Sequence, residues 1–336
     1  MYNLPKNGYT QDEYLHEDMT TLLCDTSLKY NKVRPLYSDG TQAECKSIFG
    51  INHSYNLREG LPISTIRKIN FNAAIDELLW IWQKKSNNVM DLRSRIWDDW
   101  ATTNNKGELT IGKSYGYQLA KEVFKNPLPE VFGDREKINR VEMLFYKLIF
   151  NPSDRRMIVN MYDDNDLDEM NLPPCAFMTM FNVQGNSLNM TLVQRSGDFL
   201  VAAHPRGWNC TKYATLLLII AHCTGYIANT FNHYVNDLHL YNRHEDILKK
   251  LYRSSLERDI NKSSNYNQNI FMIHQTDNDV HEKNERLIKA LEMFNSLTVE
   301  KPNIDNETMK IIAKDNSIVL YNYEYQNNIK NIEIAI

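Results

Sequence analysis

Cys175 has the sequence surroundings that a nucleophilic cysteine needs. It directly follows Pro173 and Pro174, which stiffen the backbone before it, and Arg195 ends a strand-like segment further along. The thiolate is the reactive form of cysteine, and a neighbouring cation favours that form. Together with the carboxamide of Asn209, this stretch suits covalent attack on a nucleotide base. A buried structural cysteine is the alternative interpretation of Cys175 alone.

Several arginines form the candidate anion site. Arg195 and Ser196 are adjacent, and a guanidinium beside a hydroxyl matches the oxygens of a phosphate. Arg155 and Arg156 are also adjacent and are predicted to lie at the start of a strand. Neighbouring residues of a strand point to opposite faces, so these two arginines would not bind one anion from a single strand. The alternative for this pair is a solvated charged loop.

Glu77, His239 and Tyr241 are further candidates for chemistry. Glu77 lies in a strongly apolar helical segment, where a carboxylate is either a capped structural group or an acid or base. His239 and Tyr241 are two residues apart, so on a strand they share one face. They can hold a sugar hydroxyl, and they equally suit a structural pair at a sheet edge.

The hydrophobic pattern predicts the elements that must position these residues. Alternating apolar and polar residues predict strands at 45–55, 157–162, 177–183 and 187–195. Helical spacing of apolar residues predicts helices at 72–85, 138–150 and 211–223. We therefore expect an α/β chain with an irregular N-terminal arm at 1–38 and one domain at 39–336, with a helical insertion at about 245–315.

Composition excludes several classes of function. The 336 residues carry a net charge of −4, which argues against DNA binding through a basic face. The five cysteines show no CxxC spacing, so we expect neither a metal site nor a disulfide framework. Scattered free cysteines are typical of a reducing compartment, so we expect the protein in the cytoplasm. The longest apolar run, 216–221, is too short for a membrane span.

Motifs in the same order along the chain resemble those of the thymidylate synthase family: DELLW (76–80), IWDDWA (96–101), YG (115–116), NPSDRR (151–156), LPPC (172–175), QRSGD (194–198), WN (208–209) and HLY (239–241). The resemblance implies a mixed β-sheet covered by helices and a homodimer formed through the sheet. It also implies one-carbon transfer from 5,10-methylenetetrahydrofolate to a pyrimidine deoxynucleoside monophosphate. The superfamily includes the pyrimidine nucleotide hydroxymethylases of bacteriophages, which would place the protein in a host cytoplasm.

The resemblance also implies a role for each matching residue. Cys175 would add to C6 of the base, Glu77 would organise water for proton transfers, and Tyr115 would help to remove the C5 proton. Arg195 and Ser196 would hold the 5′-phosphate.

Other matching positions complete the implied site. Arg155 and Arg156 would reach the phosphate from the other subunit, which removes the difficulty of opposite strand faces. His239 and Tyr241 would hold the 3′-hydroxyl of the deoxyribose. The folate would be bound by Trp97, Trp100, Asp198 (also counted as catalytic) and the terminal Ile336.

Asn209 bears on the choice of base. An asparagine can accept from N3–H and donate to O4 of uracil, whereas cytosine presents the reversed pattern. The deoxycytidylate hydroxymethylases of phages have an aspartate at this position, so Asn209 favours deoxyuridylate. A site built for one pattern rejects the other, because a mismatch leaves buried polar groups unpaired.

The chain also departs from the family pattern. Gly40 stands where a phosphate-binding arginine is expected, unless Arg34 or Lys46 substitutes for it. Ala176 replaces a histidine, Asn236 replaces a glycine, and the loop between Asp198 and Asn209 is a few residues longer.

A remodelled wall beside the base is compatible with entry of water. We therefore expect C5 hydroxymethylation of deoxyuridylate, with thymidylate synthesis as the alternative. Deoxycytidylate hydroxymethylation and a catalytically silent homologue that binds nucleotide or RNA are less favoured.

Overall fold

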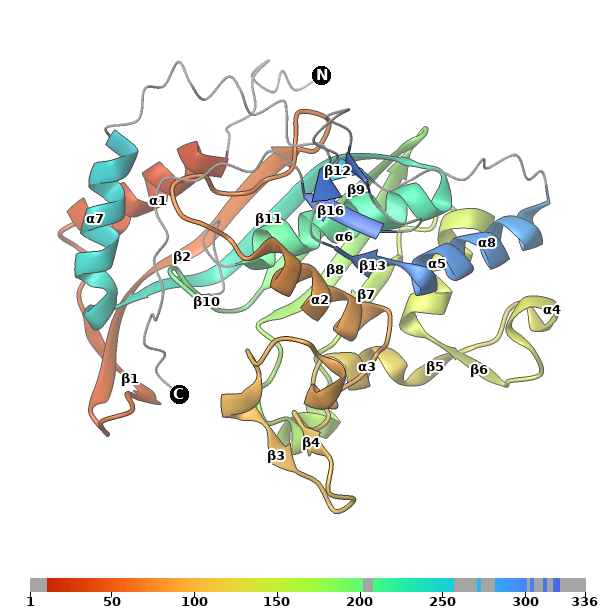
Figure 1. Cartoon of the computed structure of the whole chain (residues 1–336), viewed down its shortest axis with the longest axis horizontal. Helices are drawn as coiled ribbons and strands as arrows, with labels where there is room; N and C mark the ends of the chain where they lie inside the picture. Colours follow the sequence, from red (N-terminus) through yellow and green to blue (C-terminus); the bar gives the residue numbers. More distant parts are fainter. Residues whose placement is uncertain are drawn as a thin grey trace.

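A mixed seven-stranded sheet forms the centre of the protein, for which a computed structural model describes residues 11–201, 208–256, 271–272, 282–300, 303–304, 311–312 and 317–320. The strand order is β1-β2-β11-β9-β8-β7, with β10 beside β11 (Figure 1). Their bounds are β1 (Asn31–Leu36), β2 (Gln42–Asn56), β7 (Ile158–Asn160), β8 (Ala176–Gln184), β9 (Ser187–Gln194), β10 (Gly197–Asp198) and β11 (Ile227–Tyr241). Neighbouring strands are antiparallel, except that β11 runs parallel to β9 and β10.

Side-chain alternation explains the central strands. In β9, Leu188, Met190 and Leu192 are buried, and Asn189 and Thr191 between them are partly exposed. A strand places successive side chains on opposite faces, so this pattern covers one face with core residues. The four strands predicted from the sequence are confirmed as β2, β7, β8 and β9.

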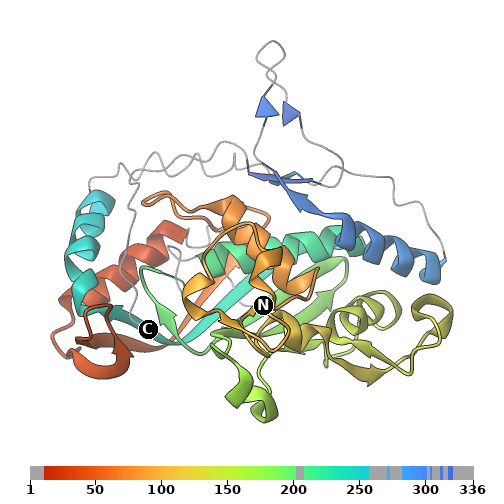
Figure 2. The same cartoon turned by 60° about the horizontal axis from the view of Figure 1, so that its bottom comes forward.

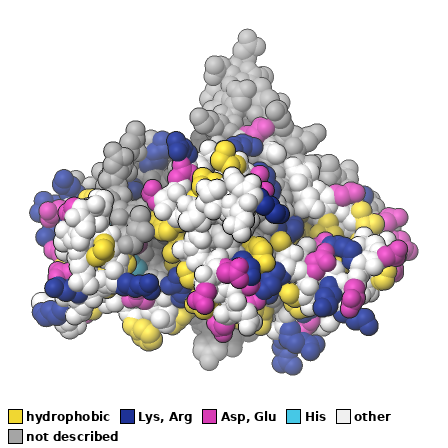
Figure 3. Space-filling view, turned by 90° about the horizontal axis from the view of Figure 1, so that it is seen from below, with side chains coloured by type: hydrophobic (Ala, Val, Ile, Leu, Met, Phe, Trp, Pro, Cys, Tyr) yellow, Lys and Arg dark blue, Asp and Glu magenta, His cyan; other side chains and the backbone are white. Residues whose placement is uncertain are grey.

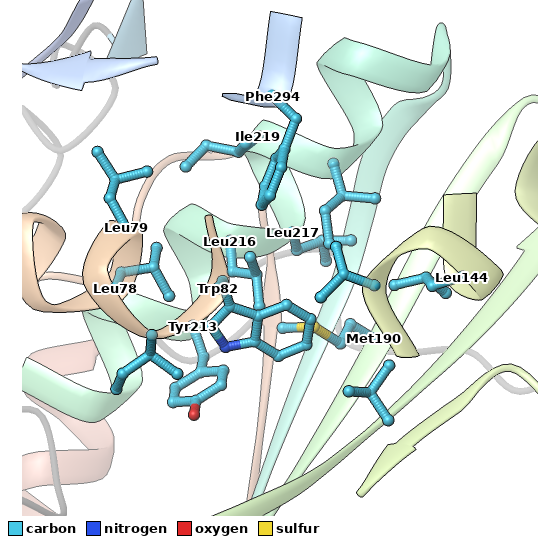
Figure 4. Packing of buried hydrophobic residues seen from close by; sticks show 14 of the residues in the cluster. Leu78, Leu79, Trp82, Leu144, Met190, Tyr213, Leu216, Leu217, Ile219 and Phe294 are labelled. Carbon is cyan, nitrogen blue, oxygen red and sulfur yellow. The ribbon is translucent and has the colours of Figure 1, made fainter. Parts of the chain in front are cut away.

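Helices pack on one side of this sheet. The central helix α6 (Trp208–Thr224) contacts β9, β11, α2 (Phe71–Trp82), α5 (Arg140–Phe150) and α8 (Lys283–Ser296). In Figure 2, α2, α6 and α8 lie on the same side of the sheet. Trp82, Tyr213, Leu217 and Phe294 fill the space between these helices (Figure 4). Each such buried side chain contributes about 1.5–3 kcal/mol, so the core holds α2 and α6 firmly.

The N-terminal segment is more regular than the sequence prediction. Residues 11–24 form α1 (Gln11–Cys24), which packs against α7 (Glu245–Leu256), and β1 follows. Leu15, Met19 and Leu22 of α1 are fully buried against Leu248 and Leu251 of α7. The prediction of an irregular arm is wrong for these elements, because an apolar stripe at helical spacing fixes α1 on α7.

The predicted helical insertion at 245–315 contains α7 and α8 but also short strands, so that prediction is only partly correct. These strands are β12 (Phe271–Met272), β13 (Thr298–Val299), β14 (Asn303–Ile304) and β15 (Ile311–Ile312), and β16 (Ser317–Leu320) pairs with β12 and β13. Leu287 and Phe294 of α8 belong to the main core. The Nε2 of Gln83, at the end of α2, donates to the carbonyl oxygens of Phe294 at 2.8 Å and Leu297 at 2.9 Å.

Smaller elements lie beside the helices. They are the hairpins β3 (Thr102–Thr103) with β4 (Leu109–Thr110) and β5 (Glu122–Lys125) with β6 (Lys137–Asn139), and the helices α3 (Gly116–Ala120) and α4 (Pro129–Phe132). Figure 3 shows Lys and Arg interspersed with Asp and Glu over the face seen from below. Within the described ranges, no helix is long and apolar enough to cross a bilayer.

Candidate active site

Cys175 lies immediately before β8, in a loop that Arg195 holds in place. The backbone N–H of Cys175 donates to the Tyr115 hydroxyl at 3.0 Å, and its carbonyl accepts from the N–H of Arg195 at 2.9 Å. The Arg195 guanidinium donates from Nη2 to the Pro173 carbonyl at 2.7 Å and from Nε to the Pro174 carbonyl at 3.1 Å. These bonds leave Nη1 without a hydrogen-bond partner among the described residues, so Arg195 can both fix the loop and bind an anion.

Burial raises the pKa of the Cys175 thiol, and the charges of Arg195 and Lys212 offset part of that rise. The thiol is therefore mostly protonated near neutral pH in the free protein. The fraction of thiolate depends on these two cations, because they stabilise the negative charge in a buried, poorly solvated environment.

Glu77 and Lys212 form a buried ion pair between α2 and α6. Lys212 Nζ lies 2.6 Å from Glu77 Oε2, and Trp97 Nε1 donates to Glu77 Oε1 at 2.9 Å. Only 3% of the Lys212 side chain and 5% of the Glu77 side chain are exposed. A buried charge is stable only with a partner, so the lysine and the indole hold Glu77 as an oriented carboxylate.

Tyr115 occupies a strained backbone conformation that brings its hydroxyl to Cys175. Its φ is +44°, which non-glycine residues rarely adopt. The next residue must be glycine, because a Cβ on Gly116 would lie 2.0 Å from the Ser86 carbonyl oxygen. The Tyr115 ring is 5.3 Å from that of Trp97, and burial raises the pKa of Tyr115 well above its usual value. The hydroxyl is therefore neutral.

The carboxamide of Asn209 belongs to a chain of buried polar groups. Asn209 Nδ2 is 3.5 Å from Gln194 Oε1, which also lies 3.0 Å from His233 Nε2. Gln194 Nε2 donates to the carbonyl of Ser196 at 2.9 Å. This chain links the carboxamide to the backbone beside Arg195.

Asp198, His239 and Tyr241 are brought together by the parallel pairing of β10 with β11. Asp198 is opposite His239 in this pairing. The rings of His239 and Tyr241 are 5.2 Å apart, and His239 Nδ1 is 3.1 Å from Asp237 Oδ2. The shared strand face predicted for His239 and Tyr241 is therefore observed.

Trp97 and Trp100 form an aromatic pair, and Asp198 carries a buried hydrogen-bond acceptor. The ring of Trp100 is 5.7 Å from that of Trp97. Asp198 Oδ1 accepts from the N–H of Leu200 at 2.8 Å, and Oδ2 is buried without a hydrogen-bond partner among the described residues. Ile336 and most of the long loop before Asn209 lie outside the described residues.

Arg155 and Arg156 lie in an exposed turn before β7 and not on a strand, which corrects the expectation above. Arg156 Nε is 3.0 Å from Asp154 Oδ1. In the described part of the chain, no hydrogen bond or ion pair joins either arginine to Arg195. The argument from opposite strand faces therefore does not apply to this pair.

The position of the expected phosphate-binding arginine is a turn. Gly40 lies between β1 and β2 with φ of +77°. Of the two suggested substitutes, Lys46 is engaged, with Nζ 3.4 Å from Glu245 Oε2 and 4.9 Å from the Tyr30 ring centroid. Arg34 is exposed on β1, so it is the more available of the two.

Residues that the sequence analysis missed include Lys212, Gln194 and His233. The signal for Lys212 was a charged residue in a helix that is otherwise apolar nearly all round, as it was for Glu77. Gln194 and His233 gave no comparable signal, because buried polar pairs depend on which strands become neighbours. Within the described residues, no group of three or more His, Cys, Asp or Glu side chains is arranged to hold a metal ion.

Known proteins share sequence and fold with this chain. The family model described as thymidylate synthase matches residues 23–335. A thymidylate synthase of Bacillus subtilis subsp. natto is 38% identical over 215 residues, which are 63% of this chain and 72% of that protein. A thymidylate synthase of Bacillus mojavensis is 38% identical over 247 residues, or 73% of this chain and 77% of that protein.

The fold comparison extends over nearly the whole chain. The structure of the thermostable thymidylate synthase A from Bacillus subtilis superposes with a TM-score of 0.74 and 28% identity, covering 98% of this chain and all of that one. The mixed sheet and its helical cover are therefore confirmed as the fold of that enzyme. The chain belongs to the thymidylate synthase family and is a one-carbon transferase.

Proposed function

We propose that the protein is a thymidylate synthase, which converts deoxyuridylate to thymidylate with 5,10-methylenetetrahydrofolate. The observation that supports this most strongly is the position of Cys175, fixed between the Tyr115 hydroxyl and the Arg195 guanidinium. The relatives at 38% identity are named thymidylate synthases, and this favours methylation over the hydroxymethylation expected from the sequence.

Cys175 starts the proposed reaction as the nucleophile. Its thiolate forms a bond to C6 of the base, and the C5=C6 electron pair moves toward the C4 oxygen, which makes C5 nucleophilic. Arg195 and Ser196 hold the 5′-phosphate and so keep the base beside the sulfur. Holding the reacting atoms in the correct orientation lowers the activation barrier of the addition. After the one-carbon unit is attached to C5, Tyr115 assists the loss of the C5 proton. Once that carbon has been reduced, or has taken up water, the C6–S bond breaks with its electrons, which restores the C5=C6 bond and releases the Cys175 thiolate.

The folate supplies the one-carbon unit and, in a synthase, the hydride that reduces it to methyl. We assign its binding to Trp97, Trp100 and Asp198, whose buried Oδ2 acceptor suits a pterin donor. The Trp97 indole also donates to Glu77, so the folate wall and the carboxylate share one residue. His239 and Tyr241 are assigned to the 3′-hydroxyl of the nucleotide.

A homodimer would complete the phosphate site. Arg155 and Arg156 are exposed in the turn that leads into the edge strand β7. In the same sheet, Ile158 and Met180 are paired in register and are 44% and 36% exposed. We assign this surface to the dimer contact and the two arginines to the phosphate of the partner's site.

Hydroxymethylation of deoxyuridylate is the second candidate. It is favoured by Ala176, a fully buried small side chain directly after the nucleophile. In that reaction water adds to the one-carbon unit at C5, and no hydride is transferred.

One assay distinguishes the candidates. The protein is mixed with deoxyuridylate and methylenetetrahydrofolate, and dihydrofolate absorbance is followed together with the mass of the product nucleotide. Stoichiometric dihydrofolate and a methyl product support the synthase, whereas a hydroxymethyl product without dihydrofolate supports the alternative. A parallel reaction with deoxycytidylate tests the base preference.

The Cys175→Ala variant is the control for the covalent mechanism. It should lose turnover and keep nucleotide binding. Nucleotide or RNA binding by the parent protein without any turnover would instead indicate a silent homologue.

A further inference from the structure

A buried lysine adjoins the proposed catalytic groups, and the mechanism above does not use it. Lys212 is 2% exposed and lies on the largely apolar helix α6. It follows Asn209 by three residues, and residues at that spacing are neighbours on one helix face. The ammonium is therefore on the side of α6 that carries the base-reading carboxamide.

The contacts of Lys212 leave part of its hydrogen-bonding capacity free. Its Nζ is 2.6 Å from Glu77 Oε2 and 5.6 Å from the centre of the Tyr213 ring. An ammonium has three N–H donors, and among the described residues Glu77 is its hydrogen-bond acceptor. The ammonium therefore has N–H donors beyond the one that Glu77 accepts.

Lys212 also acts electrostatically on the nucleophile. Together with Arg195, it lowers the pKa of the Cys175 thiol against the rise caused by burial. The ammonium is therefore close enough to affect both Glu77 and Cys175, and these two groups come from different parts of the chain.

We propose that Lys212 is a positioning residue that holds the Glu77 carboxylate in one orientation, so that this carboxylate can accept the proton that leaves C5. The inference rests on the proposed function, because it needs a reaction at C5. The proton passes through water to Glu77, the electrons of the C5–H bond form the exocyclic C=C bond, and the bond to the folate nitrogen breaks with its electrons. Methyl and hydroxymethyl products both require this step.

Replacement of Lys212 tests the proposal with readouts that a purely structural role would not change. Lys212→Met keeps most of the side-chain volume and removes the charge. We expect kcat to fall at least about tenfold, with the KM for deoxyuridylate within about twofold.

A thiol measurement tests the same proposal without turnover. Iodoacetamide alkylation of Cys175, followed by mass spectrometry of its peptide, should have a higher pH midpoint in Lys212→Met than in the parent. The double variant Glu77→Gln/Lys212→Met restores charge neutrality and should return the midpoint toward the parental value. Its kcat should be no lower than that of Glu77→Gln alone, because Lys212 acts through Glu77.

Lys121→Met is the matched control. Lys121 Nζ also pairs with a buried carboxylate, that of Asp166 at 2.7 Å, but this pair lies outside the assigned site. It should leave kcat and the Cys175 midpoint unchanged. A parental kcat together with a parental thiol midpoint in Lys212→Met would overturn the proposal. If Lys212→Met does not fold, the double variant carries the test. The proposal is then overturned if the pH midpoint of Cys175 alkylation in the double variant is shifted as far as it is in a variant that lacks the Arg195 guanidinium.

The failure of the proposed function has a different signature. If the parent protein does not turn over deoxyuridylate, the proposed function fails in the parental assay, before any variant is compared. The effect of Lys212 on the Cys175 midpoint is still measured in that case.

Discussion

Nη2 of Arg195 lies 2.7 Å from the carbonyl oxygen of Pro173, so the residue assigned to the phosphate also ties down the loop that carries the nucleophile. Binding of substrate and placement of the thiol are therefore coupled through one guanidinium. A phosphate on the free Nη1 would restrain the side chain further, because charge-assisted hydrogen bonds are short and directional.

Arg195→Lys should separate charge from geometry. Lysine keeps the positive charge and loses the fork that bonds two carbonyls, so we expect kcat/KM for deoxyuridylate to fall about 10- to 100-fold and the free energy of unfolding to fall by about 1–3 kcal/mol. Steady-state kinetics and urea denaturation measure the two effects. Arg58→Lys, at a surface bond to Ser187, is the control, and equal losses in both variants would contradict the coupling.

Asn209→Asp should change the preferred base. An aspartate offers acceptors only, so it leaves O4 of uracil without its donor, and a protonated aspartate suits cytosine. We expect kcat/KM for deoxyuridylate to fall by about 100-fold or more relative to deoxycytidylate. The ratio of the two nucleotides is read in competition assays, and an unchanged ratio would mean that another group reads the base.

Mixing of inactive subunits tests the proposed sharing of arginines. Cys175→Ala and the double variant Arg155→Ala/Arg156→Ala should each have little activity alone. In a mixed dimer, one site combines the intact Cys175 of one subunit with the intact arginines of the other. Mixing after reversible dissociation should therefore restore activity, up to half that of the parent for each mixed dimer. Persistent inactivity of a mixture that has exchanged subunits would exclude a shared site.

Glu245 gives a prediction of acid sensitivity. Hydrogen bonds from Lys249 and Tyr30 lower its pKa from 4.5 to about 2, with Lys46 contributing. A lowered pKa in the folded state stabilises the protein above the unfolded-state value, and the contribution is lost as the pH falls from about 4.5 toward 2.

Glu245→Gln should therefore reduce the stability difference between pH 6 and pH 3 in urea denaturation. The effect is discounted for partial exposure of the carboxylate, so we expect up to about 1 kcal/mol. Asp246→Asn, at an exposed neighbour, should keep the parental difference. If Glu245→Gln keeps the parental pH dependence of stability, the bonds from Lys46 and Lys249 to this carboxylate do not contribute to that dependence.

The central helices and strands could be predicted from the sequence because their apolar residues recur at regular spacing. Leu188, Met190 and Leu192 alternate as a strand requires, and α6 is apolar on nearly every face. The helix α1 was missed although Leu15, Met19 and Leu22 are at helical spacing, because polar residues surround them and their partner α7 is far away in the chain.

The candidate site was predictable to a lesser extent. The motif around Cys175 pointed to the thiol and to Arg195 before any fold was known. The pairing of Glu77 with Lys212 was not predictable from local pattern, because it joins two helices whose crossing depends on the whole core. The turn at Arg155 was misread as a strand because β7 starts only at Ile158.

The two bonds from Gln83 to the end of α8 have a consequence for how this chain tolerates shortening. Gln83, at the end of the helix that bears Glu77, donates hydrogen bonds to carbonyl groups of a segment more than two hundred residues later in the chain. A truncated protein that stops after α7 would expose Trp82 and the Leu216–Ile220 side of α6 to solvent and would leave the Gln83 amide without its acceptors. The segment at 283–300 therefore supports the helix that bears Glu77, and its removal should inactivate the protein although no residue assigned to a ligand lies in that segment.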